Sequence, residues 1–374
     1  MNLAINKSNW KKVKFGSVVK KISNKINPNE YNSDIVVEGG HINKRDLQIR
    51  NYKNKKKLGY LGPAFHMGFK KEQTLYVSRN PHLMKVGYPS FNGICANTTY
   101  ILETINESIL RNDLIPFIML SDRFIEQSIS NVRGGVNPYV NWGDLDCIEI
   151  HIPPTKKEQA DLSTLLWSMN EVNENNLKLE ESLKIARNAF FKNLMHVSKG
   201  EKVPLSKILI PKKEKSKKPH IYEKFIGLED INSGDFTINN FSESNNIESV
   251  GSIIKKNDLC YSKLRPYLDK AFISPFDAIS TSELLIYDTK LVSKEYVLYH
   301  FHSEPFINYV SRMGYGTKMP RVNNKIIGAF PILIPKDEKV ILEKLKKFSE
   351  SLSDLKLKLL HSKKLQVSLI NQIF

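Results

Sequence analysis

Cysteines and long hydrophobic runs are scarce in this sequence, and each scarcity excludes a class of protein. The three cysteines among 374 residues, Cys95, Cys147 and Cys260, form no CxxC pair. An odd number of distant cysteines supports neither a disulfide framework nor a zinc cluster, so we expect reduced core residues. No apolar run reaches the roughly 18 residues that span a membrane, and residues 1–7 lack a secretory apolar core. We therefore expect a cytoplasmic protein that does not enter a membrane.

Catalytic motifs are missing as well. The sequence has no GxxxxGK[ST] nucleotide loop and no HExxH zinc helix, and its histidines form no catalytic or metal spacing with Cys or Asp. Asn137-Pro138-Tyr139 shares part of the amino-methyltransferase motif Asn-Pro-Pro-Tyr but lacks the second proline, so we interpret it as a turn. We expect no catalytic residue, bound metal or bound cofactor, and a nuclease with dispersed carboxylates stays open.

The composition predicts a globular protein with a polyanionic partner. A length of 374 residues and a hydrophobic content of 41% allow two domains, each with its own core. The formal charge is +17, and basic side chains that neutralise phosphates release counterions and so favour binding. Since the hydropathy argues against a membrane, we expect nucleic acid as the partner.

The chain contains an internal repeat of about half its length. The clearest block matches ten residues at one offset of 182 positions, which argues against chance similarity. Earlier blocks match at offsets of 190, 189 and 185, a drift that small insertions and deletions explain. The ten residues in the first copy are Ser121, Phe124, Ile125, Gly134, Pro138, Val140, Asn141, Ile150, Ile152 and Pro153.

Each copy ends in a β-branched strand closed by proline and followed by a long helical pattern. In both helices apolar residues advance in steps of three and four, which is a heptad seam. A stripe this narrow predicts that the helices pack together as an antiparallel coiled coil; alternatively, each packs on its own domain. The polar residues Asn176, Ser362 and Gln366 interrupt the seam. Polar residues in a seam often fix the register of the two helices, and the alternative is that these positions are poorly packed. The predicted seam includes Leu165, Met169, Val172, Asn176, Leu179, Leu183, Leu352, Leu355, Leu359 and Leu369.

The basic charge lies outside these helices, which carry net charges of 0 and +4 and so leave +13 for the globular segments. Equivalent turns with Arg or Asn in both copies are candidates for reading bases, because Arg pairs with guanine and Asn with adenine in the major groove. Two glycine loops are further candidates, with plain hairpins as the alternative. Two lysine runs are weaker candidates, because solvated runs are common. The predicted DNA-binding residues are Lys55, Lys56, Lys57, Arg79, Asn80, His82, Arg133, Asn137, Tyr139, Lys213, Lys215, Lys217, Lys263, Arg265, Tyr267, Lys318 and Arg321.

This layout resembles the specificity subunit of type I restriction-modification systems. The most specific stretch runs from Ile150 to Gln159 and is similar to the family's Ile-Pro-Leu-Pro-Pro-x-x-Glu-Gln segment; residues 335–339 lack the double proline and the Gln. The resemblance implies an α+β protein with two α/β target-recognition domains, at 1–155 and 198–335. Two spacer helices, at 156–197 and 336–374, would join them as an antiparallel coiled coil.

The resemblance also implies the function and the partners. Each domain would read one half of a bipartite, asymmetric site in double-stranded DNA, and the helices would set the gap. Two methyltransferase subunits using S-adenosylmethionine would bind the chain, and a restriction subunit using ATP and Mg²⁺ could join them. The alternatives are a stand-alone DNA-binding scaffold or regulator and a single-chain methyltransferase or nuclease.

Overall fold

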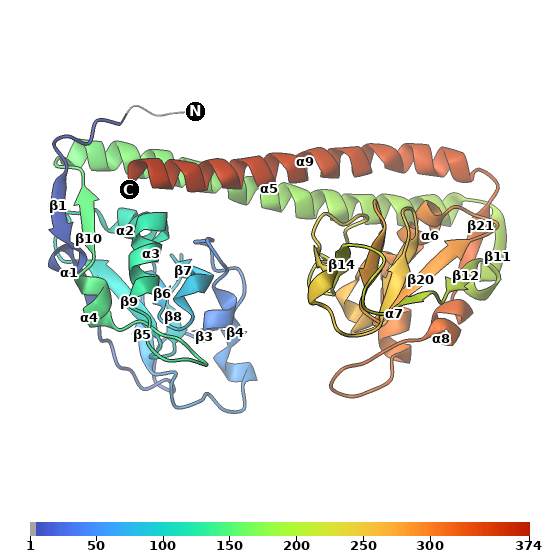
Figure 1. Cartoon of the computed structure of the whole chain (residues 1–374), viewed down its shortest axis with the longest axis horizontal. Coiled ribbons are helices and arrows are strands. Elements are labelled where there is room, and N and C mark those ends of the chain that lie inside the picture. Colours follow the sequence, from blue (N-terminus) through green and yellow to red (C-terminus); the bar gives the residue numbers. More distant parts are fainter. Residues whose placement is uncertain (1–4) are drawn as a thin grey trace. The chain divides into compact units, whose positions relative to one another are not determined.

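The computed structural model describes residues 5–374, so most of the amino-terminal segment predicted to lack a secretory core lies outside the described residues. The described chain combines helices and strands in two units (Figure 1). Unit 1 comprises Met1–Asn175 and Lys358–Phe374, and unit 2 comprises Asn176–Leu357. Each unit therefore contains one globular part and one segment of each long helix.

Three sheets form the strand part of unit 1. Their strand orders are β1-β10, β2-β9-β6-β7 and β4-β3-β8-β5. Among the strand pairs of the described residues in this unit, β3 and β8 run parallel and the others antiparallel. The bounds are β1 (Lys11–Lys14), β2 (Val19–Ile22), β3 (Ile35–Val37), β4 (Lys53–Asn54), β5 (Met67–Phe69), β6 (Thr74–Val77), β7 (Val86–Gly87), β8 (Gly93–Cys95), β9 (Thr99–Thr104) and β10 (Glu149–Ile152).

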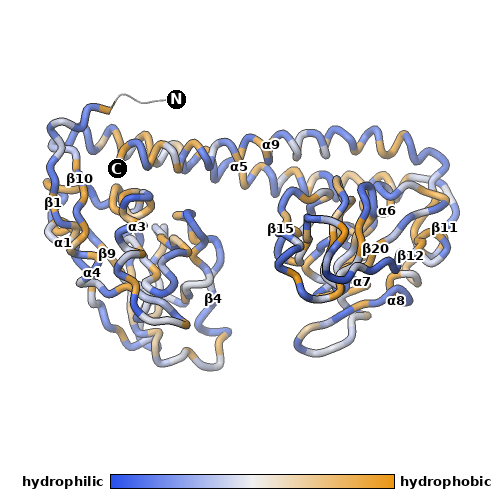
Figure 2. The backbone as a smooth tube through the Cα atoms, in the orientation of Figure 1, coloured by the Kyte–Doolittle hydropathy of each residue, from blue (hydrophilic) through white to orange (hydrophobic). Residues whose placement is uncertain are grey.

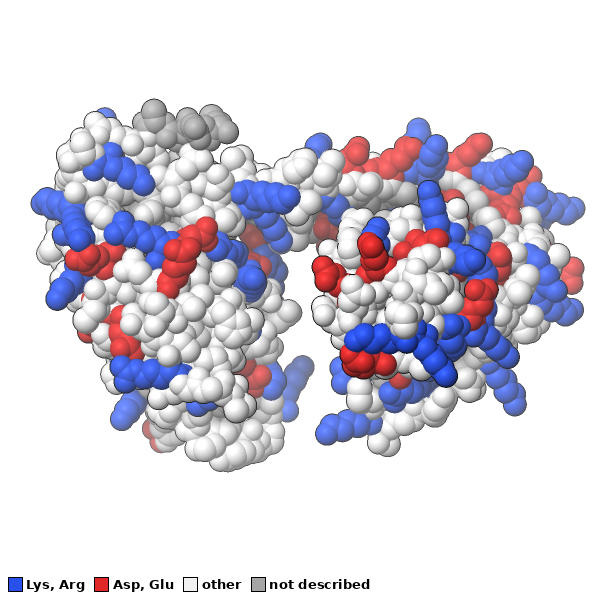
Figure 3. Space-filling view, viewed as in Figure 1, with Lys and Arg blue, Asp and Glu red and all other residues white. Residues whose placement is uncertain are grey.

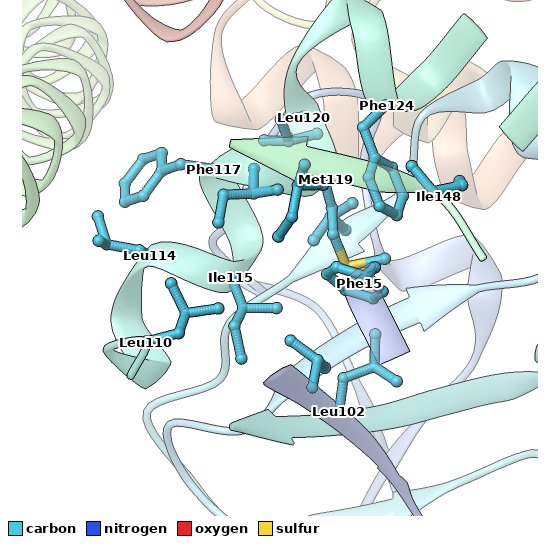
Figure 4. Close-up of a cluster of buried hydrophobic side chains, with 14 of the residues drawn as sticks. Phe15, Leu102, Leu110, Leu114, Ile115, Phe117, Met119, Leu120, Phe124 and Ile148 are labelled. Atoms are coloured by element: carbon cyan, nitrogen blue, oxygen red, sulfur yellow. The ribbon is translucent and has the colours of Figure 1, made fainter. Parts of the chain in front are cut away.

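Short helices cover the larger core of unit 1. They are α1 (Phe15–Val18), α2 (Ile115–Leu120), α3 (Asp122–Ser130) and α4 (Trp142–Asp146). Every residue of α2 is buried, and the Phe15 and Phe124 rings meet edge to face at 4.9 Å (Figure 4). The Ser121 hydroxyl accepts a hydrogen bond from the Phe124 N–H and caps α3. This core fixes the ends of the strands and helices that carry the candidate site.

Unit 2 repeats this plan. Its strand orders are β11-β21, β12-β20-β17-β18 and β13-β16-β19-β14-β15, and β14 pairs with β19 in parallel as β3 does with β8. The structure therefore confirms the internal repeat. The bounds are β11 (Gly200–Pro204), β12 (Leu209–Lys212), β13 (Lys215–Ser216), β14 (Lys224–Ile226), β15 (Ser242–Glu243), β16 (Gly251–Ile254), β17 (Leu259–Ser262), β18 (Ala271–Ile273), β19 (Ala278–Ser280), β20 (Leu284–Thr289), β21 (Pro331–Pro335), α6 (Lys294–Phe301), α7 (Glu304–Met313) and α8 (Asn324–Ala329).

The two long helices are α5 (Lys156–Val197) and α9 (Glu338–Ile373), and hydrophobic residues recur along both (Figure 2). In unit 1, Leu166 near the start of α5 shares a core with Ile373 at the end of α9. In unit 2, Phe190 near the end of α5 meets Phe348 near the start of α9, with ring centroids 5.7 Å apart. The helices are therefore antiparallel within each unit, as the fold prediction required.

The structure buries the predicted seam residues on α9, whereas on α5 three of the six predicted residues are exposed. Exposed fractions on α9 are 5–8% for Leu352, Leu355, Leu359 and Leu369, whereas on α5 they are 39% for Leu165 and 49% for Val172 and Leu179. Met169, Asn176 and Leu183 are half-buried. The buried side of α5 instead includes Gln159, Ser163, Leu166, Asn170, Asn173, Arg187 and Phe191.

Hydrogen bonds to the domain explain why the buried side of α5 differs from the predicted seam. Gln159 donates to the carbonyl oxygen of Ile109 at 2.8 Å, and Ser163 donates to Asp113 at 2.7 Å. Because α5 packs on its domain as well as on α9, polar residues with partners in the domain occupy its buried face. Of the polar interruptions, Gln366 is buried and accepts a 2.8 Å hydrogen bond from Asn173.

The cysteine prediction was correct for two of three residues. Cys95 and Cys260 are buried, but Cys147 is exposed. Cys147 follows the short helix α4 at its C-terminal end, where the chain lies at the surface.

Candidate DNA interface

A strained turn occupies the same place in both units. The 3₁₀ turn η3 (Pro81–Leu83) follows β6 in unit 1, and η7 (Pro266–Leu268) follows β17 in unit 2. A left-handed residue stands on each side of both turns: Asn80 and Met84 (φ 52° and 50°) around η3, Arg265 and Asp269 (φ 48° and 51°) around η7. Non-glycine residues adopt this conformation at a cost and cluster at functional sites. We call these two segments the recognition turns.

A glycine loop closes against each recognition turn. In unit 1 the loop is 133–139; the Arg133 N–H donates to the Tyr139 carbonyl at 2.8 Å, and the Tyr139 N–H donates back at 2.9 Å. In unit 2 the loop is 315–321, with the corresponding bonds between Tyr315 and Arg321 at 2.9 and 2.8 Å. Gly134 and Gly316 have φ of +85° and +96°, which glycine adopts without strain. The loops are thus hairpin-like in shape and also part of the candidate site.

Main-chain hydrogen bonds join each loop to its turn. The Val140 N–H donates to the Ser78 carbonyl at 3.0 Å, and the Val322 N–H donates to the Lys263 carbonyl at 2.9 Å. Isolated bridges pair Arg79 with Tyr139 and Leu264 with Arg321. The structure therefore brings together Arg79, Asn80, His82, Arg133, Asn137 and Tyr139 in unit 1, and Lys263, Arg265, Tyr267, Lys318 and Arg321 in unit 2.

The cations of these surfaces fall into two groups. Arg133 pairs with Asp144 at 2.9 Å and Arg321 with Glu283 at 3.2 Å, so carboxylates already neutralise these two. No ion pair within residues 5–374 involves Arg79 or Arg265, and the structure leaves both exposed. Exposed cations without carboxylate partners are available to a polyanion. Arg79 and Arg265 are thus the arginines best placed to contact DNA.

Comparison with known protein families identifies the first copy. Residues 7–184 match the family profile described as type I restriction modification DNA specificity domain. This segment belongs to that family. The specificity domain contains the recognition turn and loop of unit 1 together with the first part of α5. A comparison with curated proteins found no match.

The similarity to solved structures extends beyond the specificity domain and covers the fold of nearly the whole chain. One chain, from a study of complex assembly and conformational transition of the type I R-M system, has 14% identity and a TM-score of 0.51 and covers 98% of this chain and 97% of its own. The type I restriction-modification S subunit from M. genitalium has 15% identity and a TM-score of 0.51, and covers 100% and 98%. At these identities the likeness concerns the fold. Within residues 5–374 no helix is long and apolar enough to cross a membrane.

The lysine runs lie elsewhere on the specificity domain and its repeat. Lys55 donates to the Pro28 carbonyl at 2.8 Å and Lys56 pairs with Asp34 at 2.6 Å, so both have local partners. Lys215 donates to the Ser252 hydroxyl at 2.6 Å. Lys57, Lys213 and Lys217 are exposed. Among the described residues no hydrogen bond or ion pair links these six lysines to a recognition turn, and Figure 3 shows basic side chains spread over both units with acidic ones among them.

The sequence prediction missed the carboxylates of the interface. Asp144 also accepts from the Asn141 N–H in a capping box at the start of α4, and Glu283 lies just before β20. The capping-box spacing could have indicated Asp144 as a structural residue. Neither residue lies near its arginine in the sequence, so their pairing with Arg133 and Arg321 could not be predicted.

Proposed function

We propose that the chain is the DNA specificity subunit of a type I restriction-modification enzyme. Each unit reads one half of a bipartite, asymmetric site in double-stranded DNA. The subunit itself is not catalytic, and it directs adenine methylation or restriction by partner subunits. S-adenosylmethionine, ATP and Mg²⁺ belong to those partners and not to this chain.

The observation that carries this proposal is the recognition turn, which is built twice from different residues. Unit 1 presents Arg79, Asn80 and His82, whereas unit 2 presents Arg265 and Tyr267 in the equivalent turn. The backbone geometry is the same, but the hydrogen-bonding groups differ. Because base edges are distinguished by their pattern of donors and acceptors, the two units recognise different half-sequences.

An exposed apolar row on α5 supports binding of partner subunits. Leu165 and Val172, both in unit 1, are spaced by seven residues, so they lie along one line of the helix. Their exposed fractions of 39 and 49% are large for apolar side chains with this regular spacing. An apolar stripe with heptad spacing fits an amphipathic helix of another protein. We propose that methyltransferase subunits bind this row, which we call the outer row.

The long helices serve as the spacer between the half-sites. Seven helical residues rise about 10 Å, which corresponds to about three base pairs of DNA. Insertion of one heptad in α5 and one in α9 should widen the gap by three base pairs at most and leave each half-sequence unchanged. An unchanged gap with full activity would show that the helices do not set the spacing.

Co-expression with a candidate methyltransferase subunit from the same organism tests the function as a whole. Genome-wide mapping of methylated adenine should then give one split, asymmetric motif that disappears without this chain. The purified chain alone should neither transfer a methyl group to DNA nor cleave it. Catalysis by the partner-free chain would contradict the proposal, and DNA binding without any methyltransferase partner would favour a stand-alone scaffold or regulator.

A further inference from the structure

The exit of each recognition turn is connected to a long helix. In unit 1 the turn ends at Met84, whose carbonyl accepts a 3.0 Å hydrogen bond from the Arg45 N–H. The Arg45 Nε also donates to the Met84 sulfur at 3.0 Å. Arg45 is itself left-handed, with φ of 51°, so its backbone is fixed in a conformation with few alternatives. A single residue therefore holds the exit of the turn through both main chain and side chain.

The other end of Arg45 leads to α9. Its guanidinium forms an ion pair with Asp122, the first residue of α3. The Asp122 N–H donates to the Asn371 side chain of α9 at 2.8 Å, and the Asn371 amide donates back to the Asp122 carboxylate. The side chain of Arg45 is 20% exposed, so water screens this connection only in part. Hydrogen bonds and one ion pair thus connect α9 to the recognition turn through Asp122 and Arg45.

Unit 2 has a connection at the equivalent place made of other side chains. The Gly234 N–H donates to the carbonyl of the turn's exit residue, Asp269, at 2.9 Å, as Arg45 does for Met84. Arg187 of α5 donates to the Gly234 carbonyl at 3.1 Å and lies 3.9 Å from the ring centre of Phe236. That ring stacks on His302 at 4.7 Å, and His302 Nδ1 lies 2.7 Å from the Asp269 carboxylate.

The side chains of this second connection are buried. Arg187 is 2% exposed and His302 is 1% exposed. Burial lowers the pKa of Arg187 to about 10, so its guanidinium stays charged at neutral pH inside the protein. A buried charge needs partners, and here they are a carbonyl, an amide and an aromatic face. Both units therefore link a long helix to a left-handed turn exit, although the residues differ.

We propose that Arg45 in unit 1, and Arg187 with His302 in unit 2, are positioning residues for base recognition. They hold the exit of each recognition turn against a long helix and so fix the direction in which the turn presents its side chains. The inference rests on the proposed function, because it assumes that these turns contact bases. A small displacement of the turn should reduce discrimination between bases more than it reduces the overall affinity for DNA. Phosphate contacts tolerate such a movement, whereas hydrogen bonds to base edges do not.

The test measures discrimination at the two half-sites separately. The full chain, assembled with its modification subunits, selects sites from a DNA pool randomised in both half-sequences, and the bound DNA is sequenced. Arg45→Met should reduce discrimination about fivefold or more at the half-sequence of unit 1, and leave the other half and the affinity for non-specific DNA unchanged. His302→Leu should act only on the half-sequence of unit 2. Arg45→Lys should recover part of the loss, because a lysine can still pair with Asp122.

Arg50 provides a matched control in the same unit. It too links the domain to a long helix, through an ion pair with Glu174 of α5 and a 2.6 Å ion pair with Asp46. Within residues 5–374 no hydrogen bond or ion pair joins Arg50 to the turn. Arg50→Met should therefore leave discrimination unchanged. If Arg45→Met does not fold, Asp122→Asn replaces it and should give the same one-sided loss.

Four results would overturn the inference. A variant that loses discrimination equally in both halves would indicate general destabilisation. An Arg50→Met variant with the same loss as Arg45→Met would assign the effect to domain attachment. A split motif that is unchanged in the Arg45 and His302 variants would refute the inference alone, whereas a parent complex without any split motif would refute the proposed function as well.

Discussion

The Asn80 N–H donates a 2.7 Å hydrogen bond to the carbonyl of Pro138, and the Arg265 N–H donates one of equal length to the carbonyl of Pro320. In each unit this bond joins the left-handed entry of the recognition turn to the glycine loop. The two segments lie far apart in the sequence, yet they form one surface element. A substitution in either segment should consequently affect one half-site and not the other.

Substitution of the unpaired arginines tests this directly. Arg79→Ala or Arg265→Ala should relax specificity at one half-site and cost about 1–3 kcal/mol of binding free energy, as expected for a bidentate base contact. Binding to sites altered one base pair at a time measures the effect. Arg133→Ala, in the glycine loop of the same unit, should have a smaller effect at the same half-site, because Asp144 already neutralises Arg133. An equal loss on all sequences would assign Arg79 or Arg265 to phosphate contact.

The salt dependence of binding tests the role of the net charge. The globular segments carry +13 of the total +17, so we expect many phosphate contacts and a steep linear fall of log affinity with log salt concentration. Each neutralised phosphate contributes about −0.9 to the slope. Equilibrium binding of the assembled complex between about 50 and 200 mM salt gives this slope. A nearly flat line would contradict an electrostatic interface.

The sequence predicted the repeat and the recognition turns because both are local patterns. Turn residues such as Pro81 and Pro266 recur at fixed places in the two copies, and helix periodicity is visible without a structure. The seam of α9 was predictable for the same reason. The buried face of α5 was not, since its Ser163, Asn173 and Arg187 side chains are buried through partners distant in the sequence.

The sequence also could not distinguish free from neutralised cations. Arg321 and Arg265 are equally basic by composition, but in the described part of the chain only Arg321 of the two forms an ion pair, with Glu283 at 3.2 Å. Likewise, Asp269 and His302 showed no catalytic or metal spacing, and their 2.7 Å contact exists because the exit of η7 meets the start of α7. Such pairings depend on the tertiary fold, so no single-sequence pattern reports them.

Asp235 should make the stability of unit 2 depend on acid pH. Burial raises the pKa of its carboxyl. The ion pairs with Lys356 at 2.7 Å and Lys184 at 3.0 Å lower the pKa by more than burial raises it, so the pKa lies below its usual value. A carboxyl with a depressed folded-state pKa stabilises the fold above its unfolded pKa of about 3.9 and loses this contribution as the pH falls through the folded value. Denaturant unfolding of the full chain between about pH 7 and pH 2 should show this loss below about pH 4.

The Asp235→Asn variant checks the assignment. It removes the carboxylate partner of Lys356 and one of the two partners of Lys184, which keeps its 3.0 Å ion pair with Glu180. The variant should cost about 1–3 kcal/mol at neutral pH, and it should flatten the acid dependence. The control is Glu304→Gln, because the Lys192–Glu304 pair is 3.5 Å long and more than two-thirds exposed on both sides. Such a pair contributes about 0–1 kcal/mol. Equal effects of the two variants would contradict a special role for Asp235.

The outer row of α5 gives the last prediction. Val172 is 49% exposed, so Val172→Glu removes little buried surface and should change the unfolding free energy by no more than about 0.5 kcal/mol. If a partner helix covers the row, the same change buries a carboxylate without a partner and should weaken binding of the methyltransferase subunit about 10-fold or more. Co-purification and titration of the two proteins measure the binding.

Two further variants separate binding from folding. Lys178→Glu introduces the same charge at another exposed position of α5 and should leave partner binding nearly unchanged. Leu355→Ala removes a side chain that is 6% exposed and should destabilise the fold by about 2–5 kcal/mol. Normal partner binding by Val172→Glu would exclude the outer row as the docking surface, because a carboxylate in the middle of a helix–helix contact cannot remain solvated.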